Sequence, residues 1–232
     1  MQQTFLRMKD RPSGERPFEK CLEFGVEALT DGELLANIIR SGTKETSALE
    51  LAWKLLELHP SYKGLEGLFH LGLEEFRSVN GIGLVKSVQL ICILELSRRL
   101  SRAGFTEAHE FDCAEEIAAY YMEDMRHLDY EKVQLLFLNG HNALLREMTL
   151  SMGDSTNAFV SVRNIFAEAM RCEAVSLVLL HNHPSGSPEP SREDIMITKR
   201  VKEAGEIMGI PLLDHIIIGD RCFFSMQEED LL

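Results

Sequence analysis

One stretch of the sequence, residues 175–194, constrains the fold more than any other. It begins with a short apolar run that has β-branched members and predicts a buried strand, Val175-Ser176-Leu177-Val178-Leu179-Leu180. Because side chains alternate between the two faces of a strand, His181 and His183 are expected to point to the same side. A loop must follow, because four breakers exclude regular structure: Pro184, Gly186, Pro188 and Pro190.

A helix is predicted directly after this loop. Ser191 is a typical N-cap, the helix runs to about Met208, and Gly209 lies beyond its end. Asp194 falls in the first turn. Two imidazoles at the end of a strand and one carboxylate at the start of a helix give three metal ligands and leave a fourth position open, which indicates a catalytic zinc site.

A purely structural interpretation of the same residues exists. Asp194 lies three residues after Ser191 and could close a capping box, although that motif prefers Glu or Gln. A histidine at the end of a strand is more often a hydrogen-bonded surface residue than a metal ligand. We favour the metal site because this order of side chains gives the loop no structural advantage that Asn or Thr would lack.

The order and spacing of these residues resemble the JAMM signature of the MPN metallopeptidase-like domain: His181-x-His183, seven residues, Ser191, two residues, Asp194. Two flanking segments are similar to the bacterial RadC-like branch, residues 181–186 (HNHPSG) and residues 214–219 (DHIIIG). In that family the two histidines and the aspartate bind zinc, and the serine helps to hold the reacting oxygen. The resemblance therefore implies His181, His183 and Asp194 as zinc ligands. It implies Ser191 as a catalytic residue that donates to the developing oxyanion.

The resemblance also implies a general base, because in this family a glutamate precedes the first strand of the domain. Glu131, directly before the apolar segment Lys132–Leu138, occupies that place. Glu147, on the next predicted strand, is the alternative, and either could be an ordinary charged residue at a strand edge. Asp214 and His215 are expected to support the metal shell or the fold, since a metal-bound histidine usually donates its other N–H to a neighbouring group.

Three segments depart from the usual form of the family. Val162-Arg163-Asn164 stands where RadC-like chains commonly carry Pro-Arg-Glu. Gly153-Asp154-Ser155-Thr156 replaces the usual Gly-Thr, and the stretch from Pro12 to Pro17 is longer than usual. None of these segments contains an expected ligand, so they bear on the choice of substrate more than on zinc binding.

The overall composition excludes several classes of protein. Of 232 residues, 45% are hydrophobic and 26% are charged, which is ordinary for a globular protein. No apolar run has the length of a membrane span, and the first residues lack the apolar core of a signal peptide. The five cysteines are scattered and odd in number, which favours a reducing compartment over a disulfide framework. We therefore expect a cytoplasmic protein without a membrane partner.

The net charge of −13 is unevenly distributed along the chain. Residues 1–100 hold 13 basic and 14 acidic side chains, whereas residues 101–232 hold 11 basic and 23 acidic ones. The C-terminal part should therefore repel a polyanion, and the N-terminal part should only tolerate one.

Residues 1–103 predict a small all-α domain. The first thirty residues are expected to be irregular because of the breakers Pro12, Gly14, Pro17 and Gly25. Helices are then expected from Thr30 to before Gly42, over about Ser47–Leu58, Leu65–His70 and Leu73–Val79, and from after Gly83 to about Leu100.

The turn Gly81-Ile82-Gly83 resembles a helix-hairpin-helix loop. Glycines let backbone N–H groups and a helix N-terminus approach a phosphate, and Lys86 follows one turn later. Gly81, Gly83 and Lys86 are therefore candidates for phosphate contacts. A tight turn between packed helices is the structural alternative, since such modules often serve only protein contacts.

Residues 104–112 predict a linker to a second domain, residues 113–232. This domain is expected to start with a helix near Ala114–Met125. Further elements are predicted at Lys132–Leu138, Ala143–Leu150 and Ala158–Val160 (strands), at Arg163–Arg171 (helix), at the strand and helix of the metal site, and at a closing hairpin across Gly219 and Asp220. The predicted fold class is α/β (α+β): a helical domain followed by a mixed sheet with flanking helices. The resemblance implies that this sheet domain is of the MPN/JAMM type, similar to cytidine deaminase.

Two functions remain open. The first, which the resemblance implies, is a zinc-dependent hydrolase of peptide or isopeptide bonds that acts on a peptide or protein substrate. The alternative is a DNA-associated repair or recombination adaptor, in which the helical domain makes weak DNA contacts and the zinc site is structural or vestigial. The sequence does not specify the substrate or the oligomeric state.

Overall fold

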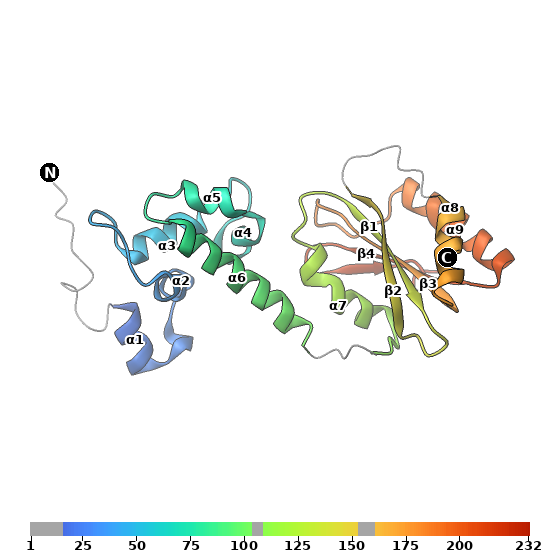
Figure 1. The fold of residues 1–232 in the computed structure, drawn as a ribbon, viewed down its shortest axis with the longest axis horizontal. Helices are drawn as coiled ribbons and strands as arrows, with labels where there is room; N and C mark the ends of the chain where they lie inside the picture. The colour runs from blue at the N-terminus through green and yellow to red at the C-terminus, as the bar shows by residue number, and fades with distance from the viewer. Residues whose placement is uncertain (1–15, 104–108, 153–160) are drawn as a thin grey trace. The chain divides into compact units, whose positions relative to one another are not determined.

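The structure is a computed structural model that describes residues 16–103, 109–152 and 161–232. The chain divides into two compact units, Met1–Ser97 and Arg98–Leu232 (Figure 1). Each unit has a hydrophobic core of its own. The division falls inside helix α6 (Leu84–Ser101), before the predicted domain boundary at residue 103. None of the helices in the described parts of the chain has the length and apolarity needed to cross a bilayer.

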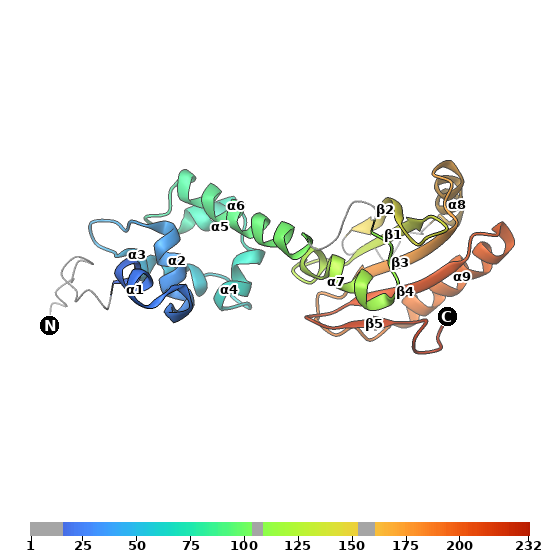
Figure 2. The same cartoon turned by 90° about the horizontal axis from the view of Figure 1, so that it is seen from below.

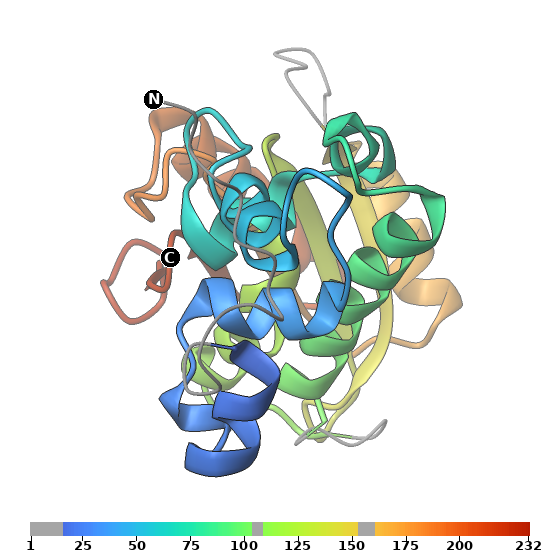
Figure 3. The same cartoon turned by 90° about the vertical axis from the view of Figure 1, so that its left-hand side faces the viewer.

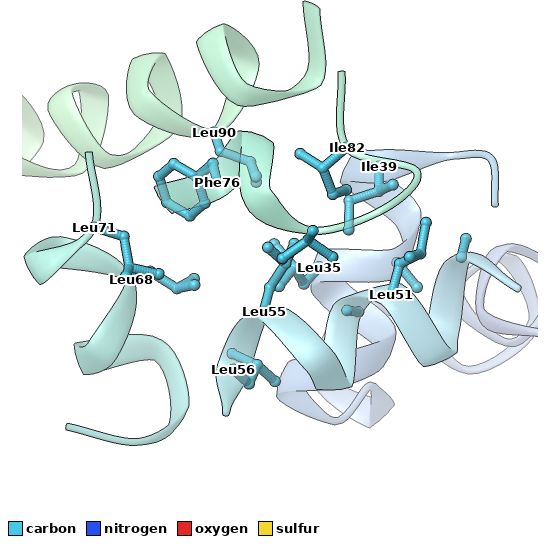
Figure 4. Close-up of a cluster of buried hydrophobic side chains, with 14 residues drawn as sticks. Leu35, Ile39, Leu51, Leu55, Leu56, Leu68, Leu71, Phe76, Ile82 and Leu90 are labelled. Atoms are coloured by element: carbon cyan, nitrogen blue, oxygen red, sulfur yellow. The ribbon is translucent and has the colours of Figure 1, made fainter. Parts of the chain in front are cut away.

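The N-terminal unit is a cluster of short helices, coloured blue to green in Figure 3. Helices α2 (Asp31–Ile39) and α3 (Ala48–Leu56) each begin with a complete capping box. Their apolar faces pack with those of the later helices around the fully buried Phe76 (Figure 4). These later elements are the 3₁₀ turn Leu68–His70, α5 (Leu73–Ser78) and α6, and the short helix α4 (Gly64–Gly67) leads into that turn.

The expectation of irregular structure before Thr30 was wrong for the described part of that segment. Helix α1 spans Pro17–Phe24, and a 3₁₀ turn follows at Val26–Ala28. Pro17 occupies the first turn of the helix, where its missing N–H costs no hydrogen bond, and Gly25 ends the helix with φ 86°. These breakers therefore flank the helix instead of interrupting it. Pro12 and Gly14 lie outside the described residues.

The C-terminal unit is built on one five-stranded sheet of order β2-β1-β3-β4-β5. The strands are β1 (Lys132–Leu138), β2 (Leu144–Met152), β3 (Ser176–Asn182), β4 (Leu212–Ile218) and β5 (Phe223–Ser225). All neighbours are antiparallel except β3 and β4, which run parallel and are connected by α9 (Arg192–Met208; Figure 2). The mixed sheet, its helices and the closing β4–β5 hairpin confirm the predicted fold class. The predicted strand at 158–160 and the segment 153–156 lie outside the described residues.

Helices cover both faces of the sheet. Helix α7 (Ala114–Met125) packs on one face together with Val178 and Leu180 of β3. Helices α8 (Val162–Arg171) and α9 lie on the other face (Figure 1), where they pack with Leu177 and Leu179 of β3. Strand β3 is buried along its whole length, so the two faces receive alternate residues of the same strand. By this alternation, His181 belongs to the α9 face and Asn182 to the α7 face.

The described end of the predicted linker packs against the sheet domain. Glu110 forms a β-bridge with Ala143, and the Phe111 N–H donates to the Asn142 carbonyl (3.2 Å). Phe111 is buried in the core beneath α7. Residues 104–108 of that linker lie outside the described residues.

Candidate metal centre

The end of β3 presents two imidazoles on one face of the sheet. His181 is fully buried, and its backbone is paired with Val133 of β1 and Ile217 of β4. His183 lies just beyond β3, where its N–H still donates to the Ile218 carbonyl (2.9 Å). The Nε2 atoms of the two rings are 3.0 Å apart. The structure thus brings together the pair whose spacing suggested a shared face.

Asp194 is at once a helix-capping residue and a member of this cluster. Its Oδ2 accepts from the backbone N–H (2.8 Å) and the hydroxyl (2.6 Å) of Ser191, whose Oγ accepts from the Asp194 N–H (3.1 Å). Its Oδ1 lies 3.3 Å from His181 Nε2, and Oδ2 lies 3.4 Å from His183 Nε2. The capping box and the metal site are therefore compatible, because the cap holds the carboxylate toward the two imidazoles.

The distances between the nitrogen and oxygen atoms of this cluster suit an ion with tetrahedral coordination. Nitrogen and oxygen ligands of zinc in a tetrahedral site are about 3.3–3.6 Å apart, given bonds of about 2.0–2.2 Å. The three distances among His181, His183 and Asp194 are 3.0, 3.3 and 3.4 Å. Glu131 Oε1 is 3.8 Å from both Nε2 atoms, and the four groups offer ligand atoms that all lie within 4.8 Å of one another. The four residues form a candidate metal-binding group in which Glu131 is the most distant member.

The electrostatics of the cluster favour a cation. Burial by itself raises the pKa of Asp194, but hydrogen bonds from the two imidazoles and from Ser191 outweigh it and hold that pKa far below its usual range. The bond to Asp194 raises the pKa of His183, against the opposing effect of burial. The carboxylate therefore stays ionised and attracts either a proton on the imidazoles or a metal ion between them.

A chain of buried hydrogen bonds starts at the back of His181. His181 Nδ1 contacts His215 Nε2 at 2.8 Å, and His215 Nδ1 contacts Thr198 Oγ1 at 2.5 Å. Thr198 Oγ1 in turn donates to the Asp194 carbonyl (2.6 Å). These hydrogen bonds link β3 and β4 to the first turns of α9, so they connect the two elements that carry His181 and Asp194.

The order of donors in this chain fixes the tautomers. If His181 offers the Nε2 lone pair to a metal, its Nδ1 carries the proton and donates to His215 Nε2. His215 is then protonated at Nδ1, which donates to Thr198, whose hydroxyl proton goes to the Asp194 carbonyl. Complete burial lowers the pKa of His215 well below its usual value, which agrees with the neutral ring that this order requires.

Asp214 and His215 divide the two supporting tasks expected of them. His215 contacts the candidate ligand His181, whereas Asp214 makes hydrogen bonds that stabilise the fold. Asp214 Oδ1 accepts from the backbone N–H groups of His215 (2.7 Å) and Gln227 (2.9 Å), and Oδ2 accepts from the Ser225 hydroxyl (2.6 Å). Asp214 thus holds the end of β5 and the residues that follow it against β4.

The loop after His183 is held against the β4–β5 turn. The Asp220 N–H donates to the Gly186 carbonyl (2.9 Å), and Arg126 donates to the Asp220 carboxylate (3.0 Å). A Cβ added at Gly219 would lie 2.4 Å from the Gly186 carbonyl oxygen, so only glycine lets the two segments approach this closely. The two RadC-like segments named above are therefore packed against each other.

The two glutamates considered as bases lie on opposite faces of the sheet. Glu131 immediately precedes β1 and faces the imidazole pair. Glu147 accepts from the Tyr121 hydroxyl of α7 (2.6 Å) and from the Gln134 amide (3.2 Å), on the α7 face. Only Glu131 belongs to the candidate metal-binding group, and its role as a base stays a prediction.

The Gly81–Gly83 turn of the N-terminal unit, a candidate for phosphate binding, is bridged to a neighbouring segment by Lys86. The Lys86 ammonium donates to the carbonyls of Ser41 (2.6 Å) and Gly81 (2.9 Å), and burial lowers its pKa. Gly81 has φ 103°, and a Cβ there would lie 2.6 Å from the Thr43 methyl carbon. Both residues therefore have structural tasks. Gly83 faces open space, and the phosphate contact stays a prediction.

Two protein-family descriptions match the chain. The RadC-like JAB domain matches residues 111–231, more than half of the chain, and the UPF0758 N-terminal domain matches residues 8–88. The chain belongs to the RadC-like family. This finding confirms the resemblance drawn from residues 181–194 and assigns the N-terminal unit to the domain that accompanies it.

Several relatives are similar to this RadC-like chain over nearly their whole length. A UPF0758 protein of Geobacillus thermodenitrificans is 43% identical over 222 residues, which cover 96% of this chain and 97% of the relative. A UPF0758 protein of Desulforamulus reducens is 43% identical over 229 residues, covering 99% and 100%. The UPF0758 protein YsxA of Bacillus subtilis is 41% identical over 227 residues, covering 98% and 97%. These names state no activity.

The first prediction concerns metal content. The purified RadC-like chain should bind about one divalent ion per molecule, measured by elemental analysis after loading with zinc and desalting. His183→Ala should abolish this binding, while the circular dichroism spectrum stays that of the folded protein because the two cores are untouched. His141→Ala, which removes an exposed histidine of the β1–β2 turn, serves as the control. Full metal occupancy in His183→Ala would show that the ligand assignment is wrong.

A second prediction concerns the hydrogen-bond chain behind His181. Thr198→Val removes the hydroxyl that accepts from His215 and donates to the Asp194 carbonyl, so zinc affinity should fall about tenfold in a chelator competition. Thr198→Ser keeps the hydroxyl and should stay within about twofold of the wild type. Equal zinc affinities for Thr198→Val and the wild type would show that the hydrogen bonds behind His181 do not support metal binding.

A third prediction concerns the Gly81–Gly83 turn. Gly83→Glu adds a negative charge in open space without disturbing the bonds of Lys86, so any weak DNA binding through this turn should be lost. Gly83→Ala is the uncharged control. Fluorescence anisotropy with a labelled duplex at low salt is the measurement, and unchanged binding in Gly83→Glu would exclude this turn as the contact.

Proposed function

We propose that this RadC-like chain is a zinc-dependent hydrolase of peptide or isopeptide bonds. The observation that carries the proposal is the position of Glu131, whose Oε1 lies 3.8 Å from Nε2 of both His181 and His183. Two imidazoles and one carboxylate are a ligand set typical of catalytic zinc, which leaves a fourth position for water or substrate. A carboxylate next to such a set, but farther away than the ligands, is suited to move protons at that position.

Zinc, when bound, would polarise the scissile carbonyl and acidify a water molecule beside it. The protein supplies the remaining chemistry. Glu131 accepts the proton of the attacking water and returns it to the leaving nitrogen. Its side chain is 47% exposed, so it can meet both solvent and a bound substrate. His181, His183 and Asp194 contact one another and would hold the metal, which leaves Glu131 to carry protons at the site.

Ser191 has a second task beside its predicted one. Its hydroxyl accepts from the Asp194 N–H and donates to Asp194 Oδ2, which completes the cap of α9. Donation to an oxyanion would require this proton to turn away from Asp194, a change that coordination of the carboxylate to a cation would favour. A Ser191→Ala variant would therefore lose both a helix cap, worth about 1 kcal/mol, and any contact with the reacting oxygen.

The test of the proposed function separates the base from the ligands. Glu131→Gln keeps the size of the side chain and leaves the three ligands in place, so zinc content should stay at the wild-type level. Hydrolysis of a panel of peptide and isopeptide-linked substrates should fall by about 100-fold or more, because amide nitrogen cannot accept the proton.

Glu147→Gln is the matched control, since it alters a glutamate of the same sheet on the opposite face. It should retain activity within about twofold and lose only some stability through the bond to Tyr121. Loss of activity in Glu147→Gln with activity retained in Glu131→Gln would reverse the assignment. The absence of turnover by the zinc-loaded wild type on the whole panel would count against the proposed reaction.

A further inference from the structure

The residue between the two histidines has no place in the metal cluster, although it is almost completely buried. Asn182 is 1% exposed and is the last residue of β3. Because strand side chains alternate, Asn182 leaves β3 on the face opposite to His181 and His183. A buried carboxamide requires hydrogen-bond partners, and its partners indicate what it does.

Both partners of Asn182 are backbone groups that flank Glu131. The Lys132 N–H donates to Asn182 Oδ1 (2.9 Å), and Asn182 Nδ2 donates to the Tyr130 carbonyl (3.1 Å). Only this orientation of the amide puts its acceptor against an N–H and its donor against a carbonyl. One side chain thus grips the chain on both sides of the same residue.

These two hydrogen bonds lie just beyond the end of the β1–β3 pairing. The pairing of β1 with β3 starts at Val133 opposite His181, so residues 130–132 lie outside that ladder. The Asn182 side chain adds the next link between β3 and the start of β1. It therefore sets the position of the Glu131 backbone relative to the strand that carries both histidines.

We propose that Asn182 is a positioning residue that holds Glu131 at the metal centre, by fixing the backbone at residues 130 and 132. This inference rests on the proposed function, in which Glu131 is the base. It explains why a carboxamide stands between two ligands: an apolar residue would fill the space but leave the Lys132 N–H and the Tyr130 carbonyl without these bonds. Asn182 lies on the opposite face from the metal-binding group and binds only the backbone beside Glu131, so the proposal predicts that its effect passes through Glu131.

The experiment follows the Glu131 carboxyl carbon by ¹³C NMR during a titration with zinc alone. The signal is assigned by its disappearance in Glu131→Gln. In the wild type, zinc should shift this signal because the carboxylate is held beside the ion. In Asn182→Ala the shift should fall to less than about half, while the stoichiometry of zinc should stay at one, because the Asn182 side chain bonds to none of the three candidate ligands.

Asn139→Ala is the matched control. Asn139 also binds two backbone groups through its side chain, the N–H groups of His141 (2.8 Å) and Ala143 (3.0 Å), but at the far end of β1. Its loss should lower stability without changing the zinc response of Glu131. Asn182→Asp keeps the acceptor for Lys132 and loses the donor to Tyr130, so its response should be intermediate. This variant also decides the question if Asn182→Ala does not fold.

A full zinc response in Asn182→Ala, or an absent response in the wild type, would overturn the proposal. Neither outcome depends on hydrolysis, so a protein without turnover can still support or refute the role of Asn182. Where turnover is measured, Asn182→Ala should lower it about tenfold in the wild type and have no further effect in Glu131→Gln. Additive losses in the double variant would show that Asn182 acts independently of Glu131.

Discussion

The Asp194 carboxylate is shared between the first turn of α9 and the imidazole pair at the end of β3, and the rest of the site depends on this sharing. Because β3 and β4 are parallel, α9 has to start near the end of β3 in order to return the chain to the start of β4. Ser191 caps that start and turns the carboxylate toward His181 and His183. A helix cap, which forms without any ion, thus holds the third candidate ligand in place, and the hydrogen bonds that keep the pKa of Asp194 low also keep it ready to bind a cation.

The two faces of β3 carry different parts of the site. On the α9 face lie the candidate ligands, and behind them the bonds through His215 and Thr198 orient His181 and return to α9. On the α7 face lies Asn182, whose amide grips the backbone around Glu131. Strand β3 therefore directs the candidate ligands to one face, and on the other face Asn182 positions the proposed base. This arrangement requires a central strand with neighbours on both sides, and β3 lies between β1 and β4.

Sequence patterns predicted the parts of this structure that local rules determine. The apolar run of β3, the breakers after His183 and the cap at Ser191 were enough to place the candidate ligands at a strand end and a helix start. Local rules failed at α1, where Pro17 and Gly25 proved to be the two ends of a helix. They also gave no sign of Asn182 as a backbone clamp, because its partners come from residues 130–132, some fifty positions earlier in the chain. Thr198 was overlooked, although its place four residues after Asp194 puts it on the same helix face and could have indicated it. The sequence made Lys86 a candidate for a phosphate contact because it follows Gly81 and Gly83, and its bond to the Ser41 carbonyl could not be foreseen because that bond depends on tertiary structure.

The central claim is that three side chains bind one zinc ion and leave its fourth position open beside Glu131. A crystal structure of the zinc-loaded protein, with the ion located by anomalous scattering, tests this most directly. We expect His181 Nε2, His183 Nε2 and one oxygen of Asp194 at about 2.0–2.2 Å from zinc, with water in the remaining position and the Glu131 carboxylate within hydrogen-bond reach of that water. A Glu131 oxygen bound directly to the ion as the fourth protein ligand would close the site. That result would make the zinc structural and contradict the account given above.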